Sequence, residues 1–225
     1  MDAITRLKNK VVVSVQAMPN EPLYVENCMA AMMKSVVKGG AGGLRVAGVR
    51  DVKNAKNITD IPVIGITKPE VIPQNFKEIV YITPSLDDVI SLVDAGADII
   101  AFDGTQRPRK SSLADMIKYI HINKRIAMAD ISTYEEGIEA AKLGADILST
   151  TLAGYTLESK NSPDGPDFPL LEKLVKDVDV PVILEGRIWE PKEVDKAFAL
   201  GAHAVVIGSA ITRPQLITKR FVQRG

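Results

Sequence analysis

The chain has 225 residues, enough for one compact domain that buries a large apolar core. Its 28 basic and 28 acidic residues balance, so no overall field favours nucleic acid or an anionic membrane, and any bound anion must be held locally. The single cysteine excludes an internal disulfide framework and is typical of a reducing, cytoplasmic compartment.

Short runs rich in valine and isoleucine alternate along the chain with longer stretches of helical periodicity, which indicates repeated βα units. The predicted strands are residues 11–15, 43–46, 63–66, 98–102, 126–129, 146–149, 182–184 and 204–207. A ninth apolar run, residues 79–82, has too little chain beside it for a βα unit. We expect an accessory strand or hairpin there.

A four-residue pattern, a small or apolar residue followed by Gly-Ala and then Asp or His, precedes three of these strands. Its glycines are Gly96, Gly144 and Gly201. Glycine suits the left-handed position that ends a helix, so each pattern predicts a helix end followed by a short loop. Helix starts agree, because Thr133 and Glu136 have the spacing of a capping box and Pro191 suits a first helical turn.

Eight such units predict the α/β class and a closed (β/α)8 TIM barrel, formed as a single domain by residues 1–225. The structural alternative is an open, doubly wound sheet. That fold usually carries Gly-x-Gly-x-x-Gly after its first strand when it binds a dinucleotide, and this sequence has no such motif there.

Polar residues stand at the carboxyl ends of nearly all the predicted strands, where a (β/α)8 barrel carries its active site. They are Gln16, Arg45, Lys68, Asp103, Asp130, Thr150, Thr151 and Glu185. Any one of them is explained equally well as a loop residue that reaches water, but polar groups at seven strand ends favour a site. Alternation along a strand places Lys68 on the face of Ile64 and Ile66, which predicts convergence above an apolar interior.

Lys68 and Glu185 come from opposite walls of the predicted barrel and are long enough to flank a sugar carbon. Removing a proton next to a carbonyl needs a base whose pKa is tuned toward neutrality. Burial lowers the pKa of a lysine and a nearby carboxylate raises it. The sequence leaves open which effect prevails at Lys68.

The loops after the last two strands predict a phosphate site. Gly186 and Arg187 follow the seventh strand, and Gly208 and Ser209 follow the eighth, with Arg213 shortly beyond. Backbone amides of these two loops and a short helix usually hold phosphate in this fold, and either arginine can add a charge-assisted contact. The alternative for the Gly-Ser pair is an ordinary turn.

Metal, nucleic acid and membrane are all poorly supported. The two histidines, His121 and His203, stand far apart, so we expect no metal centre. The basic stretch 107–110 lacks interleaved aromatic residues, and we interpret it as a βα loop or a patch on the barrel rim. No apolar run approaches the ~18–20 residues of a transmembrane helix.

Six blocks of sequence, in order, resemble the bacterial N-acetylmannosamine-6-phosphate 2-epimerases over about residues 11–221. They are SVQA at 14–17, PVIGITK at 62–68, MADIST at 128–133, TTLAGYT at 150–156, EGR at 185–187 and SAITRP at 209–214. The resemblance implies interconversion of N-acetylmannosamine 6-phosphate and N-acetylglucosamine 6-phosphate, a step in sialic-acid and amino-sugar catabolism. It also implies that no metal or organic cofactor is used.

The resemblance further implies that Lys68 transfers the proton, that Glu185 is its essential partner and that Arg213 meets the phosphate. The implied sugar contacts are Gln16, Arg45 and Asp130. This sequence departs from the family pattern at Val15, where many members have cysteine, at Gly104, which replaces an alanine, and in a longer loop that includes residues 75–78.

Two other functions stay open. One is a different phosphosugar isomerase or epimerase barrel, because phosphate sites recur across this fold. The other is a non-catalytic phosphosugar-binding barrel, against which the presence of both Lys68 and Glu185 argues. We expect a phosphorylated amino sugar as the small-molecule partner and a homodimer as the assembly.

Overall fold

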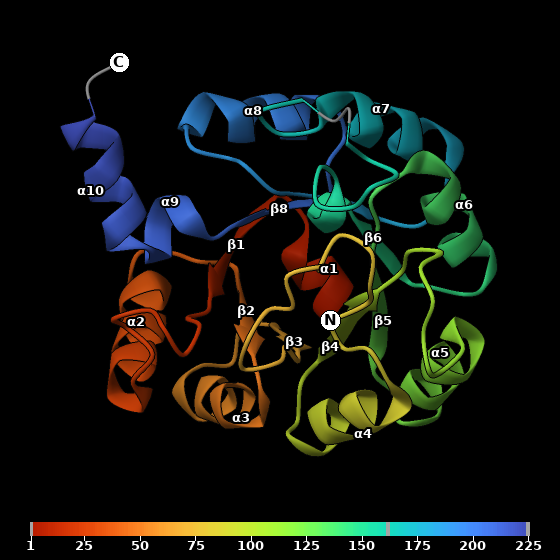
Figure 1. Ribbon diagram of the computed structural model, residues 1–225, viewed down its shortest axis with the longest axis horizontal. Helices are drawn as coiled ribbons and strands as arrows, with labels where there is room; N and C mark the ends of the chain where they lie inside the picture. The colour runs from red at the N-terminus through yellow and green to blue at the C-terminus, as the bar shows by residue number, and fades with distance from the viewer. Residues whose placement is uncertain (1, 161–162, 224–225) are drawn as a thin grey trace.

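The computed structural model describes residues 2–160 and 163–223 and shows eight parallel strands closed into a barrel (Figure 1). The strands are β1 (Lys10–Val15), β2 (Gly43–Ala47), β3 (Val63–Ile66), β4 (Ile99–Asp103), β5 (Ile126–Asp130), β6 (Ile147–Ser149), β7 (Val182–Glu185) and β8 (Ala204–Ile207). Each strand pairs with its neighbours in sequence, and β1 pairs with β8. The predicted (β/α)8 barrel is confirmed.

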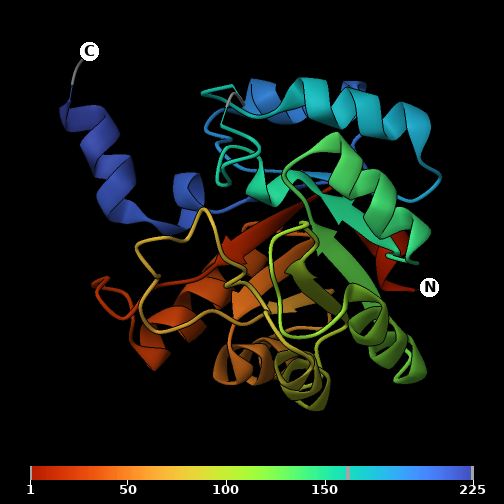
Figure 2. The same ribbon diagram turned by 45° about the vertical axis from the view of Figure 1, so that its right-hand side comes forward.

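The helices follow the strands and surround the barrel, except α1, which precedes β1 and lies at the centre of the ring in Figure 1 (Figures 1 and 2). They are α1 (Ala3–Leu7), α2 (Glu26–Lys38), α3 (Val49–Ile58), α4 (Leu86–Asp94), α5 (Leu113–Ile122), α6 (Tyr134–Lys142), α7 (Phe168–Asp177), α8 (Pro191–Ala199), α9 (Ser209–Thr212) and α10 (Pro214–Val222), with a 3₁₀ helix, η1 (Thr150–Leu152), after β6. Among the helices that the structure describes, none combines the length and apolarity needed to cross a membrane.

The local signals for helix ends are confirmed. Gly96, Gly144 and Gly201 have φ values of 91°, 100° and 92°, the left-handed region that glycine enters without steric cost. Thr133 and Glu136 form the capping box of α6, and Pro191 is the first residue of α8. These short-range rules place each following strand at the correct point of the chain.

Two apolar layers stabilise the barrel. Side chains between the strands and the surrounding helices form the larger layer, and a second cluster fills the interior. Ile64 and Ile66 of β3 belong to the interior cluster, as their alternation predicted, and Met128 of β5 and Ile183 of β7 belong to it as well. The residues that continue these faces past the strand ends therefore enter the cavity above the interior.

The ninth apolar run is not a strand, which corrects the sequence prediction for residues 79–82. Ile82 is buried in the barrel interior, and its carbonyl accepts a hydrogen bond from Asp103 N at 3.2 Å. Thr83 N donates to the carbonyl of Thr67 at 3.1 Å. This segment thus fills the gap between the ends of β3 and β4. Its residues are apolar because they are buried there, although they do not pair with a strand.

Candidate active site

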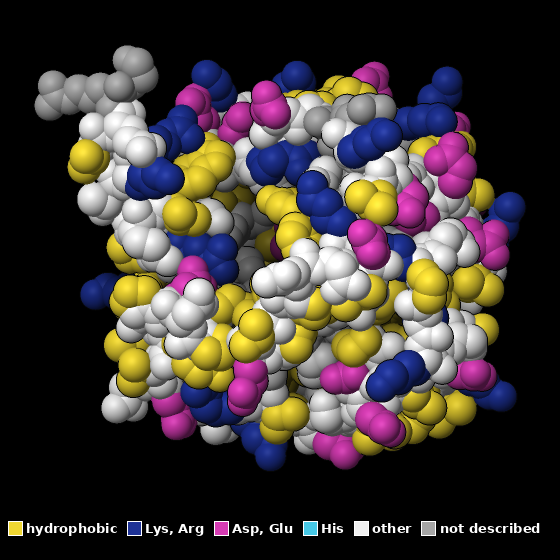
Figure 3. All heavy atoms as spheres, in the orientation of Figure 1, with side chains coloured by type: hydrophobic (Ala, Val, Ile, Leu, Met, Phe, Trp, Pro, Cys, Tyr) yellow, Lys and Arg dark blue, Asp and Glu magenta, His cyan; other side chains and the backbone are white. Residues whose placement is uncertain are grey.

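A cavity of about 460 Å³ opens at the carboxyl ends of the strands, and Figure 3 shows its mouth as a recess in that face. Polar and charged lining residues are Ser14, Gln16, Lys68, Thr151, Glu185, Arg187, Ser209, Thr212 and Arg213. Apolar and aromatic walls come from Met18, Ile72, Phe76, Tyr81, Ile82, Leu152, Tyr155, Ile188, Trp189 and Val206, and glycines from Gly186 and Gly208. The cavity is large enough for one small, polar ligand.

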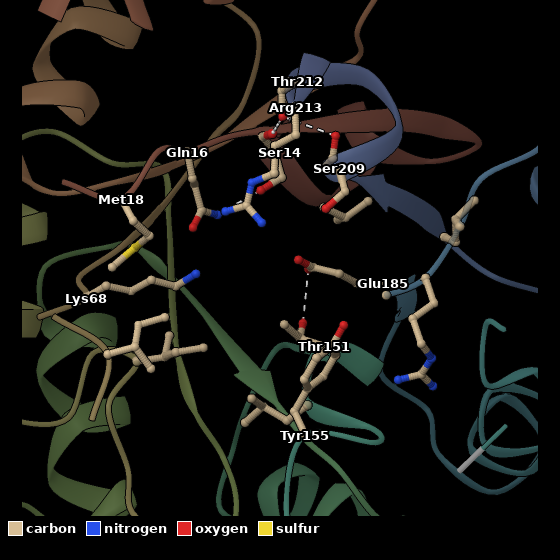
Figure 4. Close-up of a pocket in the computed structure, with 18 of the residues that line it drawn as sticks. Ser14, Gln16, Met18, Lys68, Thr151, Tyr155, Glu185, Ser209, Thr212 and Arg213 are labelled. Carbon is tan, nitrogen blue, oxygen red and sulfur yellow. Dashed lines mark hydrogen bonds between the residues drawn. The ribbon is translucent and has the colours of Figure 1, made fainter. Parts of the chain in front are cut away.

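Lys68 and Glu185 lie on opposite sides of this cavity and point toward one another (Figure 4). Lys68 stands two residues beyond β3, and Glu185 is the last residue of β7. The backbone of Glu185 is held at both its polar atoms by Thr150, whose Oγ1 accepts from Glu185 N at 3.1 Å and donates to Glu185 O at 3.0 Å. The direction of the Glu185 side chain is therefore set by the neighbouring η1 helix.

Arg45 and Asp130 lie beneath the cavity and do not line it. Both are completely buried, and the guanidinium of Arg45 meets the Asp130 carboxylate through two hydrogen bonds of 3.0 and 2.5 Å. Arg45 Nη1 also lies 3.0 Å from Glu185 Oε2. Burial by itself would lower the pKa of Arg45, but the two carboxylates raise it above its ordinary value, so the guanidinium stays charged.

Thr151 connects the same two carboxyl groups from the other side. Its Oγ1 lies 2.8 Å from Asp130 Oδ1 and 3.0 Å from Glu185 Oε2, and it also contacts Ser149 Oγ at 2.8 Å. The ion pair of Arg45 and Asp130 and the hydroxyl of Thr151 thus hold the Glu185 carboxyl group in place.

Burial decides the question that the sequence left open at Lys68. Removal from water, reinforced by the positive charge of Arg45, lowers the pKa of Lys68 from 10.5 to about 8, against the opposing pull of Glu185. Burial also raises the pKa of Glu185, which Asp130 reinforces and which Arg45, the Thr151 hydroxyl and Lys68 oppose. Burial therefore shifts the pKa of each residue in the direction that favours its neutral form.

The shifted lysine predicts how stability depends on pH. Between pH 8 and 10.5 the unfolded chain binds more protons at this residue than the folded chain, so its contribution to the free energy of unfolding rises with pH. We expect Lys68→Met to be more stable than wild type below pH 8, with the difference shrinking as the pH rises to 10.5. Denaturant unfolding over this range measures it, with the exposed Lys219→Met as control. A difference that does not vary with pH would contradict the shift.

The region predicted to hold phosphate forms another side of the cavity. Gly208 is the N-cap of the short helix α9, and Ser209 is its first residue. The Thr212 hydroxyl donates to the carbonyl of Ser14 at 2.8 Å, which ties α9 to the end of β1. Gly186, with φ of 112°, turns the chain after β7 toward the same cavity.

Arg213 reaches the cavity from the junction of α9 and α10, and Figure 4 shows its guanidinium beside Gln16. Its Nε lies 3.2 Å from Glu21 Oε1, so the side chain is oriented by an ion pair. Gln16 Nε2 donates to Ser14 Oγ at 2.7 Å, while Gln16 Oε1 is buried without a hydrogen-bond partner among the described residues. That oxygen is free to accept a ligand hydroxyl.

Arg187 lines the cavity but is largely engaged by the protein. Its Nε donates to Gly165 O at 2.8 Å, its Nη1 donates to Ala153 O, and its guanidinium lies 5.7 Å from the centre of the Tyr155 ring. These contacts join the loops that follow β6 and β7. A role in binding substrate stays a prediction for Arg187.

The basic stretch 107–110 is a βα loop, but the interpretation of its arginines as a rim patch is wrong. Arg107 is buried, with its guanidinium on the Asp103 carboxylate and its Nη1 donating to Phe76 O at 2.9 Å. Arg109 Nη1 donates to Asp103 O at 2.6 Å. Asp103 and these arginines therefore stabilise the cavity wall that carries Phe76.

The apolar walls are the part of the site that the sequence did not reveal. Several of their residues stand in connections between strands and helices, where periodicity gives no signal: Met18, Phe76, Tyr81, Tyr155 and Trp189.

No group of three or more His, Cys, Asp or Glu side chains is placed to hold a metal ion among the residues that the structure describes.

A closed (β/α)8 barrel with a polar cavity at the carboxyl ends of its strands, lined by a lysine and a glutamate that face one another, places the chain in the class of (β/α)8-barrel enzymes. The family model described as "Putative N-acetylmannosamine-6-phosphate epimerase" matches residues 29–224. The chain belongs to this family.

Individual relatives agree with the family match. Two are described as "Putative N-acetylmannosamine-6-phosphate 2-epimerase": the protein of Clostridioides difficile strain 630 is 46% identical over 98% of this chain and 97% of its own length, and that of Clostridium perfringens strain 13 is 48% identical over 96% of each. A solved structure of the N-acetylmannosamine-6-phosphate 2-epimerase from Clostridium perfringens has a TM-score of 0.93 at 46% identity, covering 99% of this chain and 96% of that one.

More distant structures share only the fold. The thiamine phosphate pyrophosphorylase from Pyrococcus furiosus has a TM-score of 0.63 at 17% identity, covering 96% of this chain and 93% of that one. Its chemistry carries no argument for this protein.

Proposed function

We propose that the protein interconverts N-acetylmannosamine 6-phosphate and N-acetylglucosamine 6-phosphate by removing and returning the proton at C2, in sialic-acid and amino-sugar catabolism. The observation that carries the proposal is the opposed pair of Lys68 and Glu185 across the cavity, with the pKa of Lys68 lowered to about 8. Membership of the family supports the choice of substrate.

The C2 hydrogen is acidic only in the opened sugar, where C2 lies next to the C1 carbonyl. Lys68 takes this hydrogen as a proton, and Glu185 assists at the oxygen from the opposite wall. The lowered pKa of Lys68 makes the free amine accessible near neutral pH, which is the form a base must have. No group outside this chain is required to accept or donate the proton.

The rest of the substrate meets the predicted binding residues. Amides of Gly186, Gly208 and Ser209 hold the 6-phosphate together with Arg213, and the free oxygen of Gln16 accepts a sugar hydroxyl. Arg45 and Asp130 do not line the cavity, so any effect they have on the sugar passes through Glu185, which they support from below. Arg187 closes the cavity beside Tyr155.

Turnover of N-acetylmannosamine 6-phosphate, followed by the appearance of N-acetylglucosamine 6-phosphate, tests the function directly. Turnover of a pentose phosphate in its place would point to another phosphosugar isomerase or epimerase. Tight binding of the amino-sugar phosphate with no conversion would point to a non-catalytic binding barrel.

Replacing Arg213 by alanine separates binding from chemistry. The 6-phosphate is remote from C2, so losing a charge-assisted contact is expected to cost about 1.5–3 kcal/mol, seen mainly as a higher KM. Steady-state kinetics measures KM and kcat separately. Lys219→Ala, at an exposed position, is the control for loss of positive charge at this end of the molecule. Unchanged affinity for the phosphorylated sugar would refute the phosphate site.

We propose further that the protein works in the cytoplasm as a homodimer in which α10 contributes to the contact. Helix α10 contains no buried residue, Phe221 and Val222 are 77% and 72% exposed, and Figures 1 and 2 show it projecting away from the barrel. An apolar helix end without cover favours a protein partner. Light scattering should give twice the chain mass, and Phe221→Asp should reduce it to one chain if α10 lies in the contact.

A further inference from the structure

Thr83 has an unusual backbone conformation for its residue type. It is completely buried, its φ is 44°, and its side chain is β-branched. A branched side chain is crowded against the backbone in this left-handed region, where glycine or asparagine is usual. Such a conformation persists only when surrounding contacts hold it, and it is found most often at functional sites. The contacts of Thr83 therefore indicate which part of the molecule its conformation serves.

Thr83 holds Thr67, the residue that precedes Lys68. Its Oγ1 accepts a hydrogen bond from Thr67 N at 3.1 Å, and its own N donates to Thr67 O at 3.1 Å. The hydroxyl of Thr67 in turn donates to Asp88 Oδ1 at 2.8 Å. The two backbone polar groups of Thr67 and its side-chain hydroxyl are thus all bound, two by Thr83 and one by Asp88.

The residues that hold Thr67 are themselves fixed. Asp88 belongs to the capping box of α4, where its Oδ2 accepts from Ser85 N at 3.1 Å and its own N donates to Ser85 Oγ at 3.3 Å. Ile82, next to Thr83, lies in the barrel interior, and its carbonyl accepts from Asp103 N of β4 at 3.2 Å. Thr67 is therefore attached to both α4 and β4.

Lys68 needs such an attachment because strand pairing does not reach it. Strand β3 pairs with β2 only as far as Ile66, two residues before Lys68. Glu185, on the opposite wall of the cavity, is still paired with Val206 of β8. The hydrogen bonds at Thr67 therefore do for the lysine what strand pairing does for the glutamate.

We propose that Thr83 is a positioning residue for Lys68, because it fixes Thr67 and with it the point from which the lysine side chain enters the cavity. This inference rests on the proposed function, in which the Lys68 amine must meet the hydrogen at C2. Proton transfer depends steeply on the distance and direction between the two reacting atoms. Release of Thr67 slows this step more than it weakens substrate binding, because the proposed phosphate site is built from other loops.

Three substitutions test the hydroxyl of Thr83. Thr83→Val keeps the branched shape and Thr83→Ala relieves the crowding, but both remove the acceptor for Thr67 N. Thr83→Ser keeps that acceptor. In turnover of N-acetylmannosamine 6-phosphate, we expect kcat to fall about tenfold in the valine and alanine variants, with KM nearly unchanged, and to stay near the wild-type value in the serine variant.

Thr59→Val is the matched control for these substitutions. The Thr59 hydroxyl also accepts a hydrogen bond from a backbone amide, that of Ile61 at 3.3 Å, but it lies before β3 and not at its carboxyl end. We expect the kcat of this variant to equal that of the wild type.

Hydrogen exchange without substrate tests the contact itself. We expect the Thr67 amide, followed by NMR, to be protected in the wild type and in Thr83→Ser, and to exchange about tenfold faster in Thr83→Val and Thr83→Ala. The amide of Ile64, within β3, should stay protected in every variant and so report that the fold is intact.

Two exchange results would overturn the proposal: an unprotected Thr67 amide in the wild type, or the same exchange rate in all variants. An unchanged kcat in Thr83→Val and Thr83→Ala would overturn it as well, and so would an equal loss in Thr83→Ser. A wild type without any turnover of the amino-sugar phosphate would overturn the proposed function and the positioning role together. An active wild type with equally active variants would overturn the role of Thr83 alone.

Discussion

Replacing Lys68 by alanine is expected to abolish measurable turnover of N-acetylmannosamine 6-phosphate. A positioned acid–base group contributes roughly 10²–10⁴-fold by itself, and here the same amine both takes and returns the proton. The fold should survive, because Lys68 is only half-buried and makes no hydrogen bond or ion pair in the described residues that the alanine would leave broken. Substrate-phosphate binding, measured calorimetrically, should be largely retained.

Incorporation of deuterium from the solvent tests directly whether Lys68 returns the proton to C2. The protons of a lysine amine exchange with water, so the wild type in deuterated water should place deuterium at C2 of the product. Mass spectrometry or NMR of the product measures it. Product without deuterium at C2, or substantial activity in Lys68→Ala, would show that the proton does not pass through this lysine.

Replacing Arg45 by methionine is expected to destabilise the fold by about 3–5 kcal/mol, the largest stability effect among these substitutions. Methionine keeps much of the length and apolar volume of the side chain but leaves the buried carboxylate of Asp130 without its cation. Glu185 loses the same partner. Denaturant unfolding at neutral pH measures the loss, which should diminish at acid pH as the carboxylates take up protons.

The double variant Arg45→Met, Asp130→Leu separates an unpaired buried charge from a packing defect. Removing both members of the pair leaves one ionisable group fewer without a partner, so the double variant should be more stable than Arg45→Met alone. The exposed Arg220→Met, with its ion pair to Glu190 at the surface, should change stability by less than ~0.5 kcal/mol. A single variant at Arg45 as stable as wild type would refute the structural role of this ion pair.

Much of the fold could be predicted because its signals are local. Alternation over four or five residues decides which side of a strand faces inward, as at Ile64 and Ile66, and left-handed glycines such as Gly144 end the helices. The apolar run at residues 79–82 misled for the same reason. The run is buried, as the position of Ile82 shows. Whether a buried segment also pairs as a strand of the sheet depends on the space between β3 and β4, which the sequence pattern does not specify.

The candidate site was likewise predicted only in part from the sequence. Of the polar residues predicted at the strand ends, Lys68, Glu185 and Gln16 line the cavity. Arg45, Asp103 and Asp130 do not line it, and all three are buried. The stretch 107–110 was interpreted as a βα loop or a rim patch, because the neighbouring residues in sequence do not indicate that Asp103 and the Phe76 carbonyl contact Arg107. The walls formed by loop residues such as Trp189 were not predicted, because loops have no periodic pattern.

The sequence by itself determined the eight βα units and the polar groups at seven of the strand ends, because both follow from the conformations of a few consecutive residues. Only the tertiary structure decided which of these groups meet. Arg45 and Asp130 are 85 residues apart in the chain and become partners when the barrel closes, and Thr151 contacts Glu185 across 34 residues. The protonation of Lys68 and Glu185 was likewise decided by closure, because a pKa depends on burial and on the distance to other charges, which strand patterns do not specify.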